Sequence, residues 1–332
     1  MNYALEDRDY IKRFYAVDVG EILLNYNSDK GRLAEYRDYR EKWESPPVHQ
    51  LDKPLELNLE LNNYCNMACS MCFRNHLPAR QRVDMSADLL ENILTFVKTH
   101  RIPCVRIGAF SECTTRRDIA QIIRQIANAD PLDFWMITNG ARLGIGDIMG
   151  SIFDAGLTHL CISLDAATQE TYEKIRGGDI SLMEIENNIL KFLEMRKKRE
   201  FRLPILRVSF VNTSENAHER ELFLEKWSKY SDIIDFQDLR ESDPSIIQKA
   251  YMENPNKLYE DSIHPLKMLV IKADGEILPC CNSDYIPNEE PVYLGKDYLD
   301  IMEYWNSDRH RSFCKKVALA KRQKNEAVCA KR

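Results

Sequence analysis

The stretch that decides the fold covers residues 55–72 and reads LELNLELNNYCNMACSMC. Its first half has a leucine at every second position, which is the spacing of a β-strand with one buried face. These leucines are Leu55, Leu57, Leu59 and Leu61. Its second half places Cys65, Cys69 and Cys72 in one short turn directly after that strand. The stretch therefore predicts a buried strand that ends in a loop carrying three thiols.

Three thiols in one loop are most informative as metal ligands. A cluster of four irons has four positions for ligands, so three thiolates leave one iron open. Structural metal sites fill all positions with protein ligands, whereas a centre that binds a small molecule keeps one open. Two other interpretations remain, because cysteines also pack as small apolar residues and Cys-x-x-Cys occurs in zinc sites and redox pairs. No second pair at zinc-site spacing follows Cys72 within thirty residues, which disfavours zinc.

The central chain then alternates between strand and helix patterns. Ser86 is a predicted N-cap for a helix over 87–99. Further strands are predicted in CVRIG, DFWMITNG, LCISLD, ILRVSFV and IIDFQDL, and helices over 119–129, 147–155, 168–176, 182–198 and 217–229. Six strands separated by helices predict a parallel α/β sheet with right-handed crossovers. Active sites of such sheets lie at the carboxyl ends of the strands, where the chemically suggestive residues also fall.

The spacing of three residues and then two in CNMACSMC resembles the cysteine motif of the radical S-adenosylmethionine (SAM) superfamily. The resemblance implies a partial (β/α)6 TIM-type barrel and a [4Fe–4S] cluster on Cys65, Cys69 and Cys72. It also implies that SAM binds the open iron and is cleaved after an electron arrives from a donor such as flavodoxin or ferredoxin. The resulting 5′-deoxyadenosyl radical abstracts a hydrogen atom from a substrate carbon.

The same resemblance implies SAM-binding residues on the first two loops. Met71, just before the third cysteine, is expected to pack beside the adenine as a polarisable apolar contact. The segment GAFSECTT resembles the family's glycine-and-glutamate turn, which grips the amino group of SAM, and it contributes Ser111 and Glu112. Ser111 and Cys113 replace the usual Gly and Pro, so a local departure in the geometry of this turn is expected.

Later strand ends supply further polar candidates. The fourth strand ends in ISLDAAT, and the resemblance implies that Ser163 and Asp165 contact the ribose hydroxyls or the methionine carboxylate of SAM. Asp165 is alternatively a cap of the next helix. Thr138 and Asn139 in TNG are either ligand contacts or an ordinary turn. Arg176 in YEKIRGG either pairs with the SAM carboxylate or braces its loop.

The strand–helix pattern stops near residue 251, and a hairpin follows. The segment HPLKMLVIKADGEILPCC reads as a strand, a turn at Asp274–Gly275 and a second strand that leads into Cys280. This layout resembles the SPASM or twitch extension of radical SAM enzymes, which holds an auxiliary iron–sulfur cluster. The resemblance implies Cys280 and Cys329 as ligands of that cluster.

The extension departs from the family pattern at two of its four expected thiolates. The upstream cysteine position falls near His264, and the usual closing Cys-x-x-Cys pair reads Cys329-Ala-Lys-Arg332. Cys281, Cys314 or His264 can substitute, because imidazole replaces thiolate in some clusters. Alternatively the auxiliary cluster is incomplete or absent.

Composition sets the broad class of protein. The chain has 332 residues, 44% hydrophobic and 30% charged, as in ordinary soluble globular proteins. The absence of a long apolar run or a secretory signal pattern argues against a membrane span, and ten cysteines then indicate a reducing, cytoplasmic compartment. A net charge of −6 argues against a nucleic-acid partner. We expect a lead-in over 1–53 with a helix at 38–43, a barrel over 54–245 and a C-terminal module over 246–332.

These features predict an enzyme that abstracts hydrogen from a small molecule such as a carbohydrate. The outcome is dehydrogenation if an auxiliary cluster oxidises the product radical, or epimerisation if a thiol such as Cys113 or Cys281 returns a hydrogen. The first fifty-odd residues look too short for a peptide-binding winged domain, which favours a small molecule over a ribosomal peptide. The alternatives are maturation of a ribosomal peptide, non-catalytic iron–sulfur electron transfer and a zinc-dependent binding module.

Overall fold

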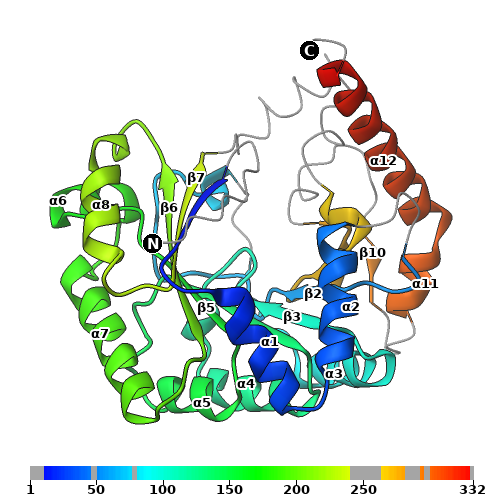
Figure 1. Cartoon of the computed structure of the whole chain (residues 1–332), viewed down its shortest axis with the longest axis horizontal. Coiled ribbons are helices and arrows are strands. Elements are labelled where there is room, and N and C mark those ends of the chain that lie inside the picture. Colours follow the sequence, from blue (N-terminus) through cyan, green and yellow to red (C-terminus); the bar gives the residue numbers. More distant parts are fainter. Residues whose placement is uncertain are drawn as a thin grey trace.

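The computed structural model describes residues 11–45, 51–76, 81–239, 263–280, 292–294 and 300–329. Within these ranges ten strands form one sheet in the order β1-β7-β6-β5-β4-β3-β2-β8-β9-β10 (Figure 1). The strands are β1 (Ile11–Tyr15), β2 (Glu56–Leu59), β3 (Cys104–Ile107), β4 (Asp133–Thr138), β5 (His159–Ser163), β6 (Ile205–Asn212), β7 (Ile233–Asp238), β8 (Met268–Ile271), β9 (Glu276–Leu278) and β10 (Val292–Tyr293). Strands β2 to β7 pair in parallel, so the six predicted parallel strands are confirmed.

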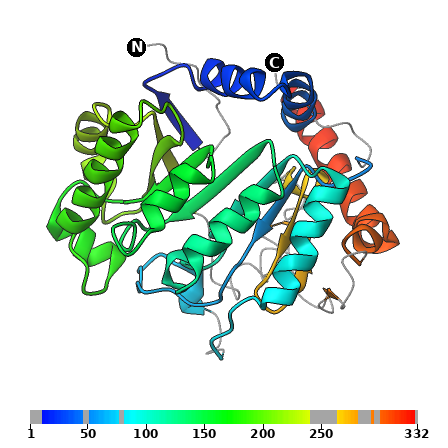
Figure 2. The same cartoon turned by 90° about the horizontal axis from the view of Figure 1, so that it is seen from below.

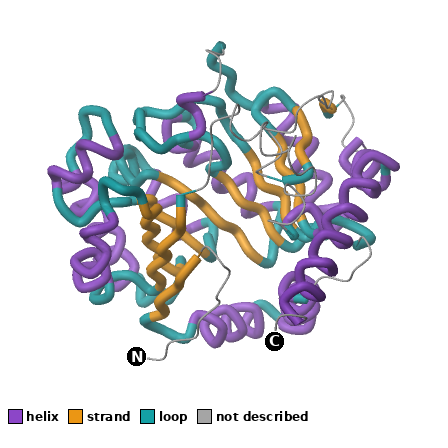
Figure 3. The backbone as a smooth tube through the Cα atoms, turned by 90° about the horizontal axis from the view of Figure 1, so that it is seen from above, coloured by secondary structure: helices purple, strands orange, loops and turns teal. Residues whose placement is uncertain are grey.

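Helices connect the parallel strands and lie outside the curved sheet (Figures 2 and 3). The helices are α1 (Val19–Asp29), α2 (Leu33–Glu44), α3 (Ala87–His100), α4 (Ile119–Asn128), α5 (Ile148–Asp154), α6 (Gln169–Arg176), α7 (Leu182–Lys198), α8 (Arg220–Trp227), α11 (Asp300–Asn306) and α12 (Asp308–Cys329). The predicted helices correspond to α3 to α8, and a short 3-10 turn over Ala217–Glu219 precedes α8. Ser86 caps α3 by accepting a hydrogen bond from the Leu89 amide, as predicted.

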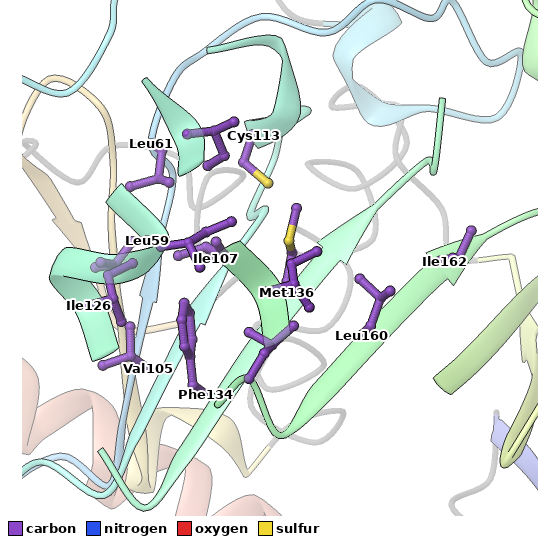
Figure 4. Close-up of a cluster of buried hydrophobic side chains, with 14 of the residues drawn as sticks. Leu59, Leu61, Val105, Ile107, Cys113, Ile126, Phe134, Met136, Leu160 and Ile162 are labelled. Atoms are coloured by element: carbon purple, nitrogen blue, oxygen red, sulfur yellow. The ribbon is translucent and has the colours of Figure 1, made fainter. Parts of the chain in front are cut away.

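The outer face of the sheet forms the main hydrophobic core. Leu57, Leu59 and Leu61 are fully buried, as the alternating leucines predict. They share one cluster with side chains such as Ile126 of α4 and Phe134 of β4 (Figure 4). Burying each such side chain stabilises the fold by about 1.5–3 kcal/mol relative to leaving it exposed. Because side chains alternate along a strand, this core leaves the intervening residues on the inner face.

Helices α1 and α2 cover the amino ends of the strands. Tyr36, Tyr39 and Trp43 of α2 are buried in a second hydrophobic cluster, together with residues at or just before the start of several strands. Those strand-end residues are Leu55, Cys104, Leu132, Ile205 and Ile233. The helix predicted at 38–43 lies within α2. The N-terminal lead-in therefore covers one end of the partial barrel.

Two strands join the sheet where local sequence patterns gave no sign of the pairing. β1 pairs antiparallel with β7 at one edge, although a helix at 38–43 was the one element expected in the lead-in. β8 pairs in parallel with β2, so the C-terminal module continues the sheet of the barrel. The predicted hairpin is confirmed, because β9 turns back on β8 through Asp274 and Gly275. The φ of Gly275 is 91°, which glycine adopts without steric cost.

Buried polar contacts join the C-terminal module to the N-terminal lead-in. Lys267 donates a hydrogen bond to the backbone carbonyl of Trp43, and its ammonium lies over the Trp43 ring. The Trp305 indole Nε1 donates to the Leu51 carbonyl at 2.7 Å. Among the helices of the described ranges, none has a stretch long and apolar enough to cross a bilayer.

Candidate active site

The three thiols of the cysteine motif lie in the loop that follows β2. All three are free; Cys69 is buried, and Cys65 and Cys72 are half-buried. The Cys72 amide donates to the Cys69 carbonyl at 3.1 Å, and the Asn75 side-chain amide donates to the same carbonyl at 2.9 Å. Burial raises the pKa of Cys65 and the pKa of Cys72, and the charge of Cys69 adds to both shifts. Cys65 and Cys72 are thus protonated at neutral pH unless a metal binds them.

This donor set fits an iron–sulfur cluster in its chemistry. Thiolates are the usual ligands of such clusters, and none of the three thiols is in a disulfide. Across the described ranges, no three His, Cys, Asp or Glu side chains are already arranged to hold a metal ion. The fit therefore rests on the kind of donor and on their proximity within one loop.

Glu112 lies at the centre of a hydrogen-bond network at the carboxyl ends of β3 and β4. Its side chain is 2% exposed. The carboxylate accepts hydrogen bonds from the Thr138 hydroxyl at 2.7 Å, the Asn139 amide at 2.7 Å and the Thr114 amide at 3.0 Å. Thr138 and Asn139 are therefore hydrogen-bond partners of Glu112. The Glu112 carboxylate thus holds the loop after β3 against the end of β4.

Ser111 lies in the same loop as Glu112, and Met71 lies in the cysteine loop. Met71 is half-buried in the cysteine loop, and the Ser111 hydroxyl donates to the Ala109 carbonyl at 3.2 Å. The two loops are joined by Arg74, which donates to the Phe110 carbonyl at 3.0 Å. Sequence reasoning missed Arg74, whose one signal was its place two residues after the last cysteine.

Ser163 ends β5, and Asp165 lies in the loop that follows it. Asp165 is 1% exposed, accepts a hydrogen bond from the Val211 amide at 2.8 Å and pairs with Arg176 at 2.7 Å. Burial raises the pKa of Asp165, and the Arg176 guanidinium opposes that shift. The interpretation of Asp165 as a helix cap is wrong, because Thr168 caps α6. The Ser163 hydroxyl lies 3.4 Å from that of Ser209 on β6.

Arg176 joins α6 to both neighbouring loops. Its Nη1 lies 3.4 Å from the Cys69 sulfur, and its Nε donates to the Leu164 carbonyl at 3.5 Å. Together with the Asp165 ion pair, these contacts make it a brace of the cysteine loop. Of the two roles left open by the sequence, this is the one the described contacts support.

Cys113 and Cys281 were considered as thiols that return a hydrogen atom to a substrate radical. Cys113 is fully buried in the outer core with Leu61 and Ile107 (Figure 4), and burial raises its pKa well above the usual value. A thiol in that position does not face the interior of the barrel. Cys161, which sequence reasoning did not consider, lies on the inner face because its neighbours Leu160 and Ile162 belong to the outer core. Cys281 lies outside the described residues.

The inner face of the sheet is lined by charged and aromatic side chains. Arg106 on β3 pairs with Glu56 on β2 at 3.0 Å, and its guanidinium lies 4.9 Å from the ring centroid of Trp135 on β4. The ring of His159 stacks on Trp135 with centroids 3.7 Å apart. Burial lowers the pKa of His159 well below the usual value, so the imidazole is neutral.

This row of side chains continues to the opposite edge of the sheet. Asp235 on β7 pairs with Arg207 on β6 at 2.7 Å and with Arg13 on β1 at 2.9 Å. One carboxylate thus contacts two guanidiniums on the inner face. Asn58 on β2 is also buried, and its side-chain oxygen has no hydrogen-bond partner among the described residues.

The C-terminal module brings a second group of soft donors together. The Cys314 sulfur on α12 lies 3.6 Å from the His310 Nε2 and donates to the Pro265 carbonyl at 3.4 Å. Burial raises the pKa of Cys314 to about 12, with a further contribution from the charge of Cys280. Burial lowers the pKa of His310 to about 4. The backbone of Cys329 ends α12, but its side chain lies outside the described residues.

Comparison with known families decides what this arrangement is. Residues 59–224, half of the chain, match the model described as the radical SAM superfamily. The chain belongs to the radical SAM superfamily. Residues 263–331 match SPASM, described as an iron–sulfur cluster-binding domain. The protein is therefore a radical SAM enzyme with a SPASM extension, and its cofactors are a [4Fe–4S] cluster, SAM and auxiliary iron–sulfur centres.

Curated relatives of this radical SAM enzyme include proteins named probable GTP 3′,8-cyclase. The one from Metallosphaera sedula is 28% identical over 179 residues, covering 54% of this chain and 53% of that protein. The one from Saccharolobus solfataricus is 29% identical over 182 residues, covering 54% of each. The chain thus spans about half the length of the curated relatives it matches.

Solved structures show that the fold is that of other radical SAM proteins. Streptococcus suis SuiB bound to S-adenosylmethionine has a TM-score of 0.58 and 16% identity, covering 86% of this chain and 73% of that one. BtrN in complex with AdoMet and 2-DOIA has a TM-score of 0.51 and 13% identity, covering 83% and 91%. At these identities the likeness supports the predicted partial-barrel fold and nothing finer.

Proposed function

We propose that this enzyme reductively cleaves SAM and abstracts hydrogen from a small, polar and negatively charged molecule, giving dehydrogenation or epimerisation. A carbohydrate linked to a nucleotide is the substrate class we favour. The observation that carries the proposal is the polar inner face of the sheet, which extends from Glu56 on β2 to Arg13 on β1. When bound, the cluster and SAM supply the one-electron chemistry that generates the 5′-deoxyadenosyl radical.

The charge of the inner face supports this substrate class. Arg106 and Arg207 both place a guanidinium on this face beside Trp135, and a guanidinium binds phosphate or carboxylate groups with two parallel hydrogen bonds. The side-chain oxygen of Asn58 has no donor among the described residues, which suits a ligand hydroxyl. Buried polar groups normally have partners, so such an atom suggests a ligand.

Residues at the carboxyl ends of the strands hold and orient the cofactors in this proposal. Cys65, Cys69 and Cys72 ligate the N-terminal cluster. The Glu112 network positions the turn over which the amino group of SAM binds, and Ser163 faces the ribose or the carboxylate. The packed outer core excludes water from behind the sheet, so the site opens only at the inner face.

The remaining parts of the proposal concern the surroundings of the enzyme. We propose three segments, with a lead-in over 1–53, the barrel over 54–245 and the SPASM module over 246–332. The enzyme is proposed to be cytoplasmic, to take electrons from a flavodoxin or ferredoxin, and to have no nucleic-acid or membrane partner.

Cyclisation of a purine nucleotide is a second candidate function. It is favoured by the 28% identity to a probable GTP 3′,8-cyclase. That match covers about half of either chain, so it bears more on the shared SAM chemistry than on the substrate. Peptide modification is a third candidate, since the similar SuiB has been crystallised with its precursor peptide SuiA. The lead-in argues against peptide modification, because its strand β1 is already paired with β7 as an edge strand of the sheet.

The test is anaerobic reconstitution with iron and sulfide, followed by reduction with dithionite and measurement of 5′-deoxyadenosine. We expect a four-iron cluster on the barrel and SAM cleavage that UDP-sugars or sugar phosphates accelerate. Deuterium from a labelled substrate should appear in the 5′-deoxyadenosine. Parallel reactions with GTP and with a mixture of short peptides test the second and third candidates.

Each alternative has its own signature. Iron binding with no 5′-deoxyadenosine under any condition indicates an electron-transfer protein, and a colourless protein that binds zinc indicates a binding module. Acceleration by GTP or by peptides alone contradicts the proposed substrate class while leaving SAM cleavage intact.

A further inference from the structure

Arg176 makes an unusual set of contacts for a residue at the end of a surface helix. It is the last residue of α6 and is only 6% exposed. Its Nη1 faces the Cys69 sulfur at 3.4 Å, and its Nη2 faces the Asp165 carboxylate at 2.7 Å. One guanidinium therefore connects a proposed cluster ligand to the carboxyl end of β5.

The backbone around Arg176 is fitted to the cysteine loop. The Ser70 amide donates to the Ile175 carbonyl at 2.7 Å. Gly177 follows with a φ of 56°, and a Cβ at that position would lie 2.9 Å from the Ala68 carbonyl oxygen. Only glycine allows this close approach without a shift of the backbone. The end of α6 is thus seated directly on the loop between Cys65 and Cys69.

Asp165 holds the guanidinium in its orientation. The carboxylate accepts one hydrogen bond from the Val211 amide at 2.8 Å and uses its other oxygen for Arg176. Asp165 has a φ of 60°, a left-handed conformation that costs free energy for a residue with a side chain. Such a conformation persists where the surroundings require it, and here it turns the carboxylate toward Arg176.

A guanidinium beside the sulfur of a cluster ligand affects the reduction potential of the cluster through its positive charge. Hydrogen bonds to the sulfurs and nearby charge are among the means by which a protein sets the reduction potential of an iron–sulfur cluster. A donor near Cys69 stabilises the reduced, more negative cluster more than the oxidised one. Residues that contact the ligands from outside in this way also fix their orientation.

We propose that Arg176 is a positioning residue that orients the Cys69 thiolate and raises the reduction potential of the N-terminal cluster, with Asp165 aiming its guanidinium. The inference rests on the proposed role of the cysteine loop and goes beyond it by assigning a function to residues that are not ligands. It makes the cluster easier to reduce before SAM is cleaved.

The experiment compares Arg176→Gln with Arg176→Lys and with Lys174→Gln. Lys174 lies two residues earlier on the same helix, is 60% exposed in its side chain and pairs with Glu170, so its loss removes the same charge without touching the loop. Each variant is reconstituted as full-length protein, and its iron and sulfide contents are measured. The reduction potential of the cluster is then determined by a redox titration that is monitored by EPR in the absence of SAM. The N-terminal cluster is recognised as the one whose signal changes when SAM is added afterwards.

We expect the potential of the N-terminal cluster to become more negative in Arg176→Gln, less so in Arg176→Lys, and to stay unchanged in Lys174→Gln. If Arg176→Gln does not retain iron, the shift in Arg176→Lys decides, because Lys keeps the charge but loses the planar fork of donors. An unchanged SAM-free potential in both Arg176 variants overturns the inference, even where SAM binding is weakened. Failure of the wild-type protein to form a four-iron cluster overturns the proposed function as well, so the two failures are distinguishable.

Discussion

The two ends of the partial barrel use buried polar residues in opposite ways. At the carboxyl ends of the strands, the buried charges of Asp165 and Arg176 pair with each other, and Arg176 also contacts the Cys69 sulfur, 107 residues away in the chain. At the amino ends, α1 and α2 cover the strands with apolar and aromatic side chains, and Asp133 is buried among them. The difference shows that one sheet supports chemistry at one end and stability at the other, as in complete α/β barrels.

The largest expected effect is the difference between substitutions of two buried cysteines, Cys69 at the carboxyl end and Cys104 at the amino end. Cys69→Ser should lose nearly all iron of the N-terminal cluster and reduce SAM cleavage to background, because a serine hydroxyl is a much poorer iron ligand than the thiolates that hold such clusters. Cys104→Ser should keep both, since Cys104 lies at the start of β3, where its thiol faces Glu56 at 3.6 Å. Iron and sulfide counts after reconstitution measure the difference. Equal iron in the two variants would show that the two ends do not differ in this way.

The second comparison concerns Asp165 at the carboxyl end. Asp165→Asn should lower the free energy of unfolding at pH 7 by about 3–5 kcal/mol, because it leaves the buried Arg176 guanidinium without a counter-charge. Asp179→Asn removes the same charge from an exposed position and serves as the control. Urea unfolding followed by circular dichroism gives both values. A loss no larger than that of the control would mean that the ion pair contributes little.

The smallest expected effect is a pH dependence at the amino end. Burial raises the pKa of Asp133, and Arg40 opposes the shift only in part. An acid whose pKa is higher in the folded state loses stability as pH rises from its unfolded value near 3.8 toward its folded value. The Asn side chain cannot ionise, so the free energy of unfolding of Asp133→Asn should increase relative to that of the wild type as the pH rises from 4 to 7. Unfolding curves that stay parallel across this range would contradict the expectation.

Local patterns were enough for most of the fold. The strands and helices from β2 to β7 follow from alternation, helical periodicity and caps such as Ser86, all of which involve neighbours within one element. The pairing of β1 with β7 and of β8 with β2 was not predictable in this way. Each joins strands from distant parts of the chain, and no local pattern states which edge a strand will occupy.

The candidate site was predicted at the level of residues but not of contacts. Glu112 and Arg176 were singled out because their segments resemble family motifs, and Asp165 because it follows a strand end. Their partners were not visible, since the Arg176 guanidinium and the Cys69 sulfur lie 107 residues apart in the chain. Arg74 and His310 were missed, because a single cation or imidazole in a helix or loop carries no pattern of its own.

The sequence by itself determined that a buried strand leads into a loop of three thiols and that strands and helices alternate after it. These features depend on spacings of two to four residues, which are set by the geometry of the backbone alone. Only the tertiary structure decided which buried charges meet and what closes each end of the sheet. A buried charge must find a partner wherever the chain brings one, and that depends on how distant elements pack.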